Sequence, residues 1–348
     1  MQHISWQQAA DLCYVLGPYR SPIATVSPGE TFTVETLDAF GGRVTSQDTP
    51  PSQVLALPYV NPVTGPIYIQ GAEKGDTLAV TIVDIKASRD FGVSATIPEF
   101  GGLCGTFLTR TLNEPLEERV WVHPIGPSGI VFDPGLDIPA IPFEPFYGTI
   151  GTSPELEAIS TLAPGFHGGN MDAPDMCPGN TAYFPVNVPG ALLHLGDGHA
   201  AQGDGEVAGT AIEMDADVTL TTELIKDGPV LEQGPHYEGP ARLMDIPSRR
   251  FYATTGLPLK AAGEIPPDMA YLESPKAAGL ENLSKDISLA ARNALLEIID
   301  YMVRTYDLTP EQAYIVASVA VDLRIGQLVD VPNVGVTAIL PLDIFDAN

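Results

Sequence analysis

Short alternating segments joined by glycine-containing turns recur through the first half of the chain. Residues 31–37 (TFTVETL) and 77–85 (TLAVTIVDI) alternate apolar and polar side chains with the two-residue period of a β-strand. The turn 72–76 (AEKGD) leads into the second of them. The chain holds 34 glycines and 33 prolines in 348 residues. Together they make up about 19% of the chain, whereas their average share in proteins is roughly 12%. Many turns between short strands favour a sandwich or barrel over βαβ units, so we predict a mainly β fold with a sandwich-like, β-rich core.

The pattern changes near the C-terminus. From Ile287 onward apolar residues follow helical spacing, with Ser284 as a candidate N-cap. Residues 309–312 (TPEQ) form a capping box with proline at the first helical position, so a second helix begins there. We therefore predict a C-terminal αα-hairpin over residues 284–323, packed on the β-rich core, and a closing strand over residues 328–341.

The chain is long enough to bury a sizeable core in one large domain or two closely packed ones. We divide it into an N-terminal segment, residues 1–20, and one unit, residues 21–348, which is β-rich over residues 21–280. In the N-terminal segment, an apolar series from Trp6 to Leu16 has the spacing of a short helix.

The net charge of −27, from 17 basic and 44 acidic residues, argues against nucleic acid and anionic membranes as partners. Such a field attracts divalent cations and does not repel a small neutral molecule. Adaptation to a saline or acidic environment would explain the charge without any function.

Three cysteines, Cys13, Cys104 and Cys177, are too few and odd in number for a disulfide framework, which favours a reducing compartment. The N-terminus (MQHISW) lacks the basic and apolar parts of a signal peptide, and no run of about 18 apolar residues occurs. We predict a cytoplasmic protein with no membrane partner.

Residues 195–206 (LGDGHAAQGDGE) combine one histidine, three carboxylates and four glycines between two strand-like segments. Glycine lets the backbone approach a ligand closely. The His199 ring and the carboxylates of Asp197, Asp204 and Glu206 offer the nitrogen and oxygen ligands that suit Zn²⁺ or a similar divalent ion. An acidic surface turn with a solvated histidine is the alternative.

A second segment of the same character, residues 167–172 (HGGNMD), contributes His167 and Asp172. Only one long strand-like stretch separates the two segments, so they can face each other across one site. Asp38, at the end of a predicted strand and just before Gly41 and Gly42, is either a further ligand or a turn-forming residue.

These segments, with several others in the same order, resemble the acetamidase/formamidase family. The resemblance extends from about residue 20 to residue 341 and rests on residues 36–42 (TLDAFGG), 61–76 (NPVTGPIYIQGAEKGD), 167–172, 183–191 (YFPVNVPGA), 196–207 and 318–330 (SVAVDLRIGQLVD). It implies a β-rich fold, a homodimer and metal-dependent hydrolysis of a short-chain amide, of the acetamide or formamide type, to a carboxylate and ammonia.

Hydrolysis of an unactivated amide needs a strong nucleophile, a polarised carbonyl and a proton for the leaving amine. A divalent metal supplies the first two and a nearby carboxylate moves the proton. The predicted metal ligands are His167, Asp197, His199 and Asp38, and the predicted catalytic residues are Glu206, Asp172 and Asp204. Glu206 is the preferred general base, while a competing interpretation makes Glu206 a ligand and Asp172 the base. Histidine favours Zn²⁺, and the many carboxylates leave Ca²⁺ or Mg²⁺ open.

Two other functions are compatible with these residues. A cysteine-dependent amidase would need an activated thiolate, for which Cys104 and Cys177 lie near glycines. A catalytically silent homologue would only bind metal or ligand on the same β-rich scaffold.

Overall fold

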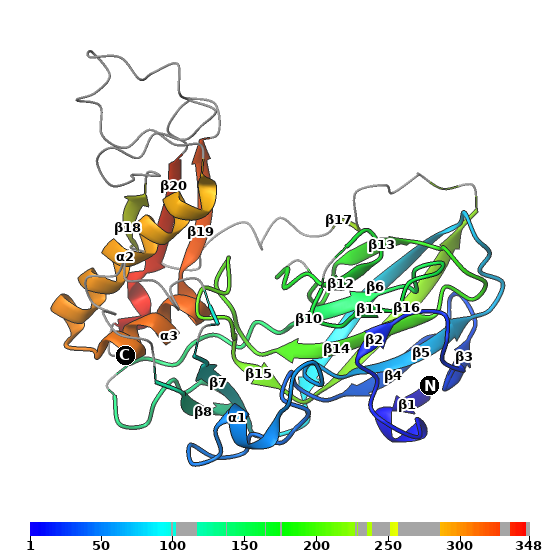
Figure 1. Cartoon of the computed structure of the whole chain (residues 1–348), viewed down its shortest axis with the longest axis horizontal. Coiled ribbons are helices and arrows are strands. Elements are labelled where there is room, and N and C mark those ends of the chain that lie inside the picture. Colours follow the sequence, from blue (N-terminus) through cyan, green and yellow to red (C-terminus); the bar gives the residue numbers. More distant parts are fainter. Residues whose placement is uncertain are drawn as a thin grey trace.

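The computed structural model describes residues 1–98, 100–101, 117–136, 138–163, 165–174, 176–226, 228, 235–238, 251–256, 286–327 and 335–345. Figure 1 shows a large β-rich part, built from the N-terminal two-thirds of the chain, beside a smaller C-terminal part that contains the two long helices. Cys104 and Ser284 lie outside the described residues.

Two sheets build the β-rich part. The first has six strands in the order β1 (Gln2–Ser5), β4 (Thr31–Thr36), β16 (Ala216–Ile225), β6 (Thr77–Ala87), β13 (Thr181–Pro185) and β17 (His236–Glu238). The second runs β12 (Gly168–Asn170), β10 (Phe146–Gly151), β14 (Leu193–His199), β15 (Glu213–Met214), β7 (Phe91–Thr96), β8 (Arg119–Gly126) and β9 (Gly129–Ile130). In that sheet β5 (Val63–Ile69) also pairs with β14 and with β3 (Ala24–Val26).

The two sheets share one hydrophobic core, to which β4 contributes Phe32 and Val34, and β10 contributes Tyr147 and Ile150. The Tyr147 hydroxyl lies 2.8 Å from the Thr36 hydroxyl and joins the sheets. Alternation of buried and exposed residues along β4 explains its place in the first sheet, because one face covers this core. The mainly β, sandwich-like fold is confirmed.

The C-terminal part contains the predicted αα-hairpin, α2 (Ile287–Tyr306) and α3 (Pro310–Ala320). The capping box at Thr309 and Gln312 is present, and Asp286 caps α2. Helix α2 packs on a separate sheet in the order β18 (Phe251–Gly256), β20 (Gly335–Pro341) and β19 (Asp322–Gln327). An added Cβ at Gly256 would collide with the Ala290 carbonyl, so glycine permits this close helix–sheet contact.

Several predicted boundaries were wrong. The hairpin ends at Ala320, since Val321 has an extended backbone and Asp322 begins β19. The closing strand is present over residues 335–341; its predicted first part, residues 328–334, lies outside the described residues and stays a prediction. The short N-terminal helix is only a 3-10 turn at Trp6–Gln8, because β1 before it pairs with β4.

The remaining short elements are α1 (Pro51–Val54), the strand pair β2 (Val15–Leu16) and β11 (Ile159–Ser160), and a 3-10 turn at Leu342–Phe345. No helix in the described ranges is long and apolar enough to cross a membrane.

Candidate metal and catalytic site

Strand register brings the first candidate residues together. Asp197 and His199 lie two residues apart in β14, so their side chains leave the same face of the second sheet. The antiparallel neighbour β15 pairs His199 directly with Glu213, and paired residues place their Cβ atoms about 5 Å apart. We had predicted a turn at Asp197–His199; they belong to a fully buried strand instead.

Gly148 of β10 makes room for the cluster. It lies opposite Asp197, between the residue pairs Tyr147–Gly198 and Thr149–Gly196. A Cβ added at Gly148 would lie 2.5 Å from Asp172 Oδ1, 2.5 Å from Asp197 Oδ2 and 2.9 Å from His199 Cε1. The carboxylates therefore occupy the space that any other residue at position 148 would fill.

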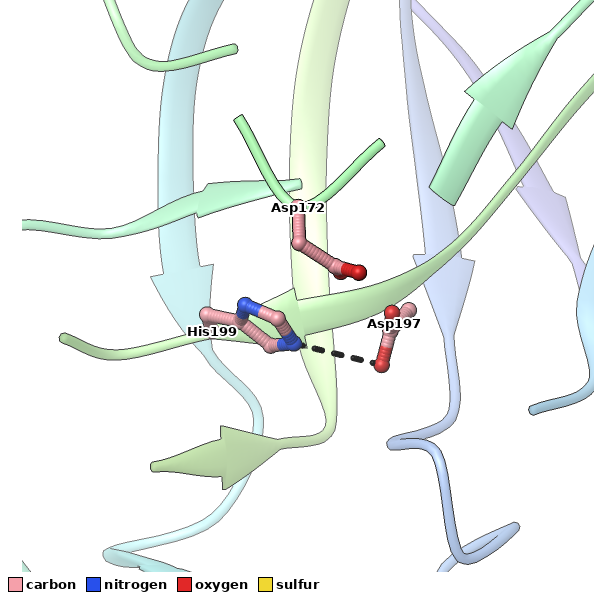
Figure 2. Close-up of side chains that lie close together, drawn as sticks. All are labelled: Asp172, Asp197 and His199. Atoms are coloured by element: carbon pink, nitrogen blue, oxygen red, sulfur yellow. Dashed lines mark ion pairs between the residues drawn. The ribbon is translucent and has the colours of Figure 1, made fainter. Parts of the chain in front are cut away.

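Figure 2 shows the side chains of Asp172, Asp197 and His199 converging on one point. The Nε2 atom of His199 lies 3.3 Å from Asp197 Oδ1 and 3.2 Å from Glu213 Oε2. Ligand atoms of Asp172, Asp197 and His199 all lie within 4.8 Å of one another, as do those of His199, Glu206 and Glu213. Five residues thus form one cluster around the His199 ring.

This cluster is an unusual concentration of buried acid. Asp197, His199 and Glu213 are at most 3% exposed. Burial, together with the charge of Asp197, raises the pKa of Asp172 to about 7. Burial also raises the pKa of Glu213 to about 7 and that of Glu206 well above its ordinary value, the latter with help from Asp172.

In Asp197 and His199 the attraction between the side chains outweighs the effect of burial on the pKa. Burial alone would raise the pKa of Asp197, but the positive charge and hydrogen bonding of His199 lower it. Burial alone would lower the pKa of His199, yet Glu213 and Asp197 raise it well above the ordinary value. The histidine thus offsets only part of the negative charge, and a further positive charge would stabilise the four carboxylates.

The donor atoms fit a divalent cation. Within the part of the chain that the structure describes, Asp197 Oδ1, Glu213 Oε2 and both ring nitrogens of His199 are buried without a well-aligned hydrogen bond, although His199 Nε2 lies at ion-pair distance from both oxygens. Buried polar atoms without partners are uncommon, and an ion is one of their ordinary explanations. One imidazole with several carboxylates suits Zn²⁺, while a set dominated by oxygen also accepts Ca²⁺ or Mg²⁺.

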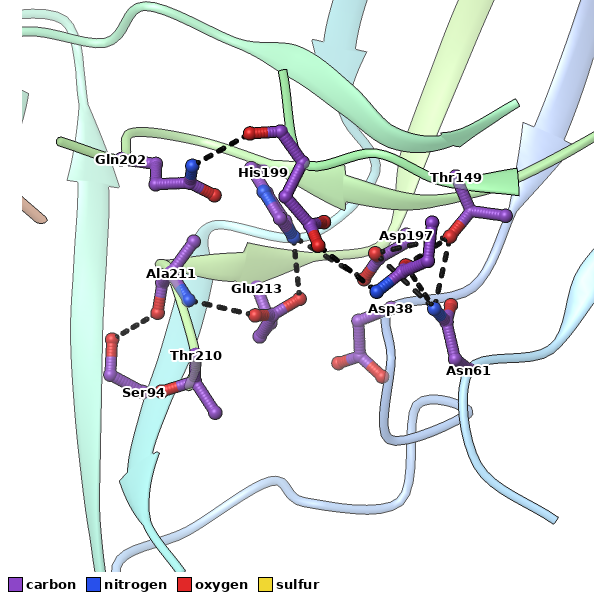
Figure 3. A network of polar contacts seen from close by, with 12 residues as sticks. Asp38, Asn61, Ser94, Thr149, Asp197, His199, Gln202, Thr210, Ala211 and Glu213 are labelled. Carbon is purple, nitrogen blue, oxygen red and sulfur yellow. Dashed lines mark hydrogen bonds and ion pairs between the residues drawn. The ribbon is translucent and has the colours of Figure 1, made fainter. Parts of the chain in front are cut away.

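Neutral amides hold the carboxylates in place (Figure 3). Asn61 Nδ2 donates to Asn170 Oδ1 at 2.7 Å and lies 3.3 Å from Asp197 Oδ2. Asn170 Nδ2 in turn donates to Asp172 Oδ2 at 3.0 Å. Thr149 Oγ1 lies 3.3 Å from Asp197 Oδ2. Asp197 is therefore oriented by two other segments of the chain, whereas Asp172 is held by Asn170 from its own segment.

The backbone is strained where the cluster forms. Asp172, Asp197 and Glu206 have positive φ angles of 46°, 62° and 40°, and the supporting Asn61 has 59°. Non-glycine residues rarely adopt this region, and such residues gather at functional sites when their surroundings enforce them.

The C-terminal part holds the loop that carries Glu206. Ser318 of α3 accepts the amide of Gly203 at its carbonyl (3.1 Å) and the amide of Ala208 at its hydroxyl (3.2 Å). The Asp322 carboxylate accepts the Asp204 amide at 3.0 Å. The loop is therefore a turn clamped from outside, with Gly205 at φ 93°, and not the extended run that would project Asp204 and Glu206 together.

The predicted ligand His167 lies apart from the cluster. Gly168 of β12 pairs with Gly151 of β10, and Gly151 pairs with His194 of β14. His167, which precedes Gly168, therefore lies near His194 across the sheet. His194 is five residues from His199 along β14, a separation of roughly 16 Å at about 3.3 Å per residue. The structure does not bring His167 to His199, and burial lowers the pKa of His167.

Asp38 and Cys177 also have other surroundings. Asp38 accepts the Gly42 amide at 2.7 Å and pairs with Arg89, the turn-forming arrangement that we weighed against ligation. The Cys177 thiol is buried and donates to the Pro178 carbonyl at 3.8 Å. Asp204 contributes through its backbone, which also accepts the Leu323 amide at 3.1 Å.

We missed Glu213, Gly148 and the two asparagines. Glu213 lies in an alternating segment, where a carboxylate is expected on the exposed face, and only its pairing with His199 reveals its burial. Asn170 lies within the His167–Asp172 segment, so of these four residues it was the one that the sequence pattern came closest to identifying.

Comparison with known proteins gives a consistent result. A model of the acetamidase/formamidase family matches residues 5–159 and 154–347. The formamidase of Methylophilus methylotrophus is 28% identical over an alignment that covers 98% of this chain and 91% of that protein. The crystal structure of the acetamidase from Yersinia enterocolitica is 33% identical, with a TM-score of 0.63 over 99% of this chain and 93% of that one. The γ-lactamase from Delftia acidovorans is 25% identical, with a TM-score of 0.81 over 96% and 89% of the two chains.

The mainly β fold and the named relatives define the chain as an amidase, a hydrolase acting on amide bonds. It belongs to the acetamidase/formamidase family, whose model covers nearly the whole chain in two overlapping matches. The family resemblance noted in the sequence is thereby confirmed.

Proposed function

We propose that this amidase hydrolyses a neutral amide, with formamide and acetamide as minimal substrates, at the cluster around His199. The observation that carries the proposal is the convergence of four carboxylates on one imidazole, where buried atoms of Asp197, His199 and Glu213 lack hydrogen-bond partners among the described residues. Asp172, Asp197, His199 and Glu213 would hold a divalent cation, with Zn²⁺ favoured. Such a cation supplies Lewis acidity that activates water and polarises an amide carbonyl near neutral pH.

Glu206 acts as the general base in this proposal. It lies beside His199 and Glu213, in a clamped loop. Its raised pKa makes it a good proton carrier, and positive charge nearby favours the ionised form that accepts a proton. Glu206 takes the proton of the attacking water as the new C–O bond forms. It returns that proton to nitrogen as the C–N bond breaks, giving the carboxylic acid and ammonia.

Asp172 is the competing base, because its pKa of about 7 also suits proton transfer. In that arrangement Glu206 is a ligand. Asn170 and Asn61 orient Asp172 and Asp197, which fixes the donor atoms before substrate binds. Of the two candidate thiols for cysteine catalysis, Cys177 is buried and takes no part in the cluster, and Cys104 lies outside the described residues.

Ammonia release tests the proposal. The purified full-length chain is assayed with formamide and acetamide before chelation, after chelation and after return of Zn²⁺, Ca²⁺ or Mg²⁺. We expect chelation to abolish turnover and one metal to restore it. Unchanged turnover after verified metal removal would contradict the metal role, and metal binding without any amide turnover would support a silent binding protein.

The homodimer, the cytoplasmic location and the lack of nucleic-acid or membrane partners stay predictions from the sequence. Light scattering of the purified chain tests the dimer.

A further inference from the structure

A cavity of about 1050 Å³ lies between the β-rich part and the C-terminal part. On one side its wall includes Phe146 at the start of β10 and residues 201–204, which follow directly after His199. On the other side it is formed by the end of α3 and the beginning of β19, including Ala320 and Leu323. Figure 1 shows these two parts of the molecule beside each other.

None of the five cluster residues lines the cavity, but two lining residues, Phe146 and Gln202, contact members of the cluster. The Phe146 ring stands edge-on to the His199 ring, with 4.9 Å between centroids. Gln202, also in the cavity wall, donates its Nε2 to the Asp172 carbonyl at 3.0 Å. Its Oε1 atom is buried and has no hydrogen-bond partner among the described residues.

Hydrogen bonds fix the wall formed by α3 and β19 against the β-rich part. Tyr314 donates to the Val207 carbonyl at 2.6 Å, and Ser318 Oγ donates to the Thr210 carbonyl at 2.5 Å. Leu323 packs so closely on the loop that an added Cβ at Gly205 would lie 2.7 Å from it. These contacts keep α3 and β19 at a set distance from the cluster.

The lining indicates what the cavity accepts. Its apolar side chains come from both parts and include Ile141, Phe143, Phe146, Leu323 and Ile344. Four acidic residues and one basic residue also line it, which leaves the charged part of the lining net negative and disfavours a substrate that carries a carboxylate: Asp84, Glu144, Asp204, Asp322 and Arg324. The lining therefore favours an uncharged, apolar group.

The cavity is much larger than a formamide-sized molecule, so such a molecule is not the best fit to it. Acetamide has four non-hydrogen atoms and displaces on the order of three water volumes, at about 30 Å³ each. The cavity is about ten times larger, at the upper end of the roughly 300–1000 Å³ of ligand pockets. A small amide at the cluster would leave most of the apolar wall without contact.

Resting on the proposed amide hydrolysis, we propose that the preferred substrate is a neutral amide with a branched or ring-bearing apolar acyl group. The amide group lies at the His199 cluster and the acyl group in the cavity between the two parts.

The test compares kcat/KM across a series of primary amides: formamide, acetamide, isobutyramide, cyclohexanecarboxamide and benzamide. We expect kcat/KM to rise by a factor of about ten or more from acetamide to the ring-bearing amides, since each additional buried methylene contributes substantially to discrimination. Two variants narrow the cavity from the C-terminal wall: Ala320→Phe, and Ile325→Trp at a lining residue that is 57% exposed and tolerant of change. Each should lower the ratio of kcat/KM for cyclohexanecarboxamide to that for formamide at least tenfold.

Val83→Trp is the matched control. Val83 is 48% exposed on β6 and does not line the cavity, so this variant should keep the wild-type ratio. Preference for formamide or acetamide over every larger amide, or a ratio unmoved in both narrowed variants, would overturn the inference while leaving amide hydrolysis intact. A complete lack of turnover for all five amides would instead overturn the proposed function, and the inference with it.

Discussion

Replacement of Gly148 by alanine tests the geometry of the cluster most directly. The added methyl group would lie 2.5 Å from Asp172 Oδ1 and from Asp197 Oδ2, whereas ordinary contact begins at 3.4 Å. The two oxygens must therefore retreat by about 0.9 Å, the difference between these two distances. Asn170 and Asn61 hold both carboxylates by hydrogen bonds, so this movement breaks the arrangement that the fold imposes.

A shift of this size is large for catalysis and for ligation. Metal–ligand distances tolerate about 0.2 Å, and a misplacement of about 1 Å can cost about 10²-fold in rate. We expect Gly148→Ala to lower kcat/KM for formamide about 10²-fold, equivalent to about 2.7 kcal/mol of transition-state stabilisation. Metal affinity should fall as well. The Gly148 backbone is not left-handed, so alanine itself is compatible with the strand.

The assay combines ammonia release, metal content and thermal unfolding. Gly126→Ala is the control, because an added Cβ at this β8 glycine meets only the Gly129 carbonyl, at 4.0 Å. The control should behave as wild type. Turnover of Gly148→Ala within about threefold of wild type, with the metal retained, would refute the placement of the reactive centre against Gly148.

Three further predictions test other parts of the site and the fold. Glu206→Gln should lower kcat by about 10²-fold or more with metal retained if Glu206 is the base; loss of metal together with activity, seen by elemental analysis, would make it a ligand. Ser318→Ala leaves the Ala208 amide and the Thr210 carbonyl without their partner, so the free energy of unfolding in urea should fall by about 1–3 kcal/mol and kcat should fall too; an unchanged kcat would show that the clamp does not position Glu206. Burial lowers the pKa of His123 from 6.5 to about 4, so the unfolded chain binds this proton first as the pH falls. Between pH 6.5 and 4 the free energy of unfolding should therefore fall by about 3 kcal/mol more in the wild type than in His123→Gln. Parallel curves of unfolding free energy against pH for the two proteins would contradict this.

Prediction from the sequence succeeded where the signal is local. The α3 helix begins at the predicted capping box because Thr309 and Gln312 satisfy backbone groups three residues apart. Strands β4 and β6, of six and eleven residues, follow from the alternation of apolar and polar side chains. The pairing of His199 with Asp197 needs only the two-residue period of one strand.

What could not be predicted depends on register. Glu213 reaches His199 because β15 pairs with β14 at that residue, and a shift of one residue would point it away from the cluster. The same register moves His167 away, since Gly168 pairs at the far end of β10. Similar local composition thus led to two different outcomes: the segment around His199 joined the cluster through its neighbours, and His167 did not.

The position of Glu206 depends on residues more than one hundred positions later in the chain. Glu206 has a positive φ angle and follows two glycines in a loop with few internal hydrogen bonds among those described. Ser318 and Tyr314 of α3, with Asp322 of β19, supply the donors and acceptors that this loop lacks. The C-terminal part therefore has two effects on the same site. It enforces the strained conformation that places Glu206 beside His199, and it closes the cavity that the acyl group would occupy. Both effects arise from one set of contacts, so a change in how α3 packs alters the catalytic geometry and the size of substrate together.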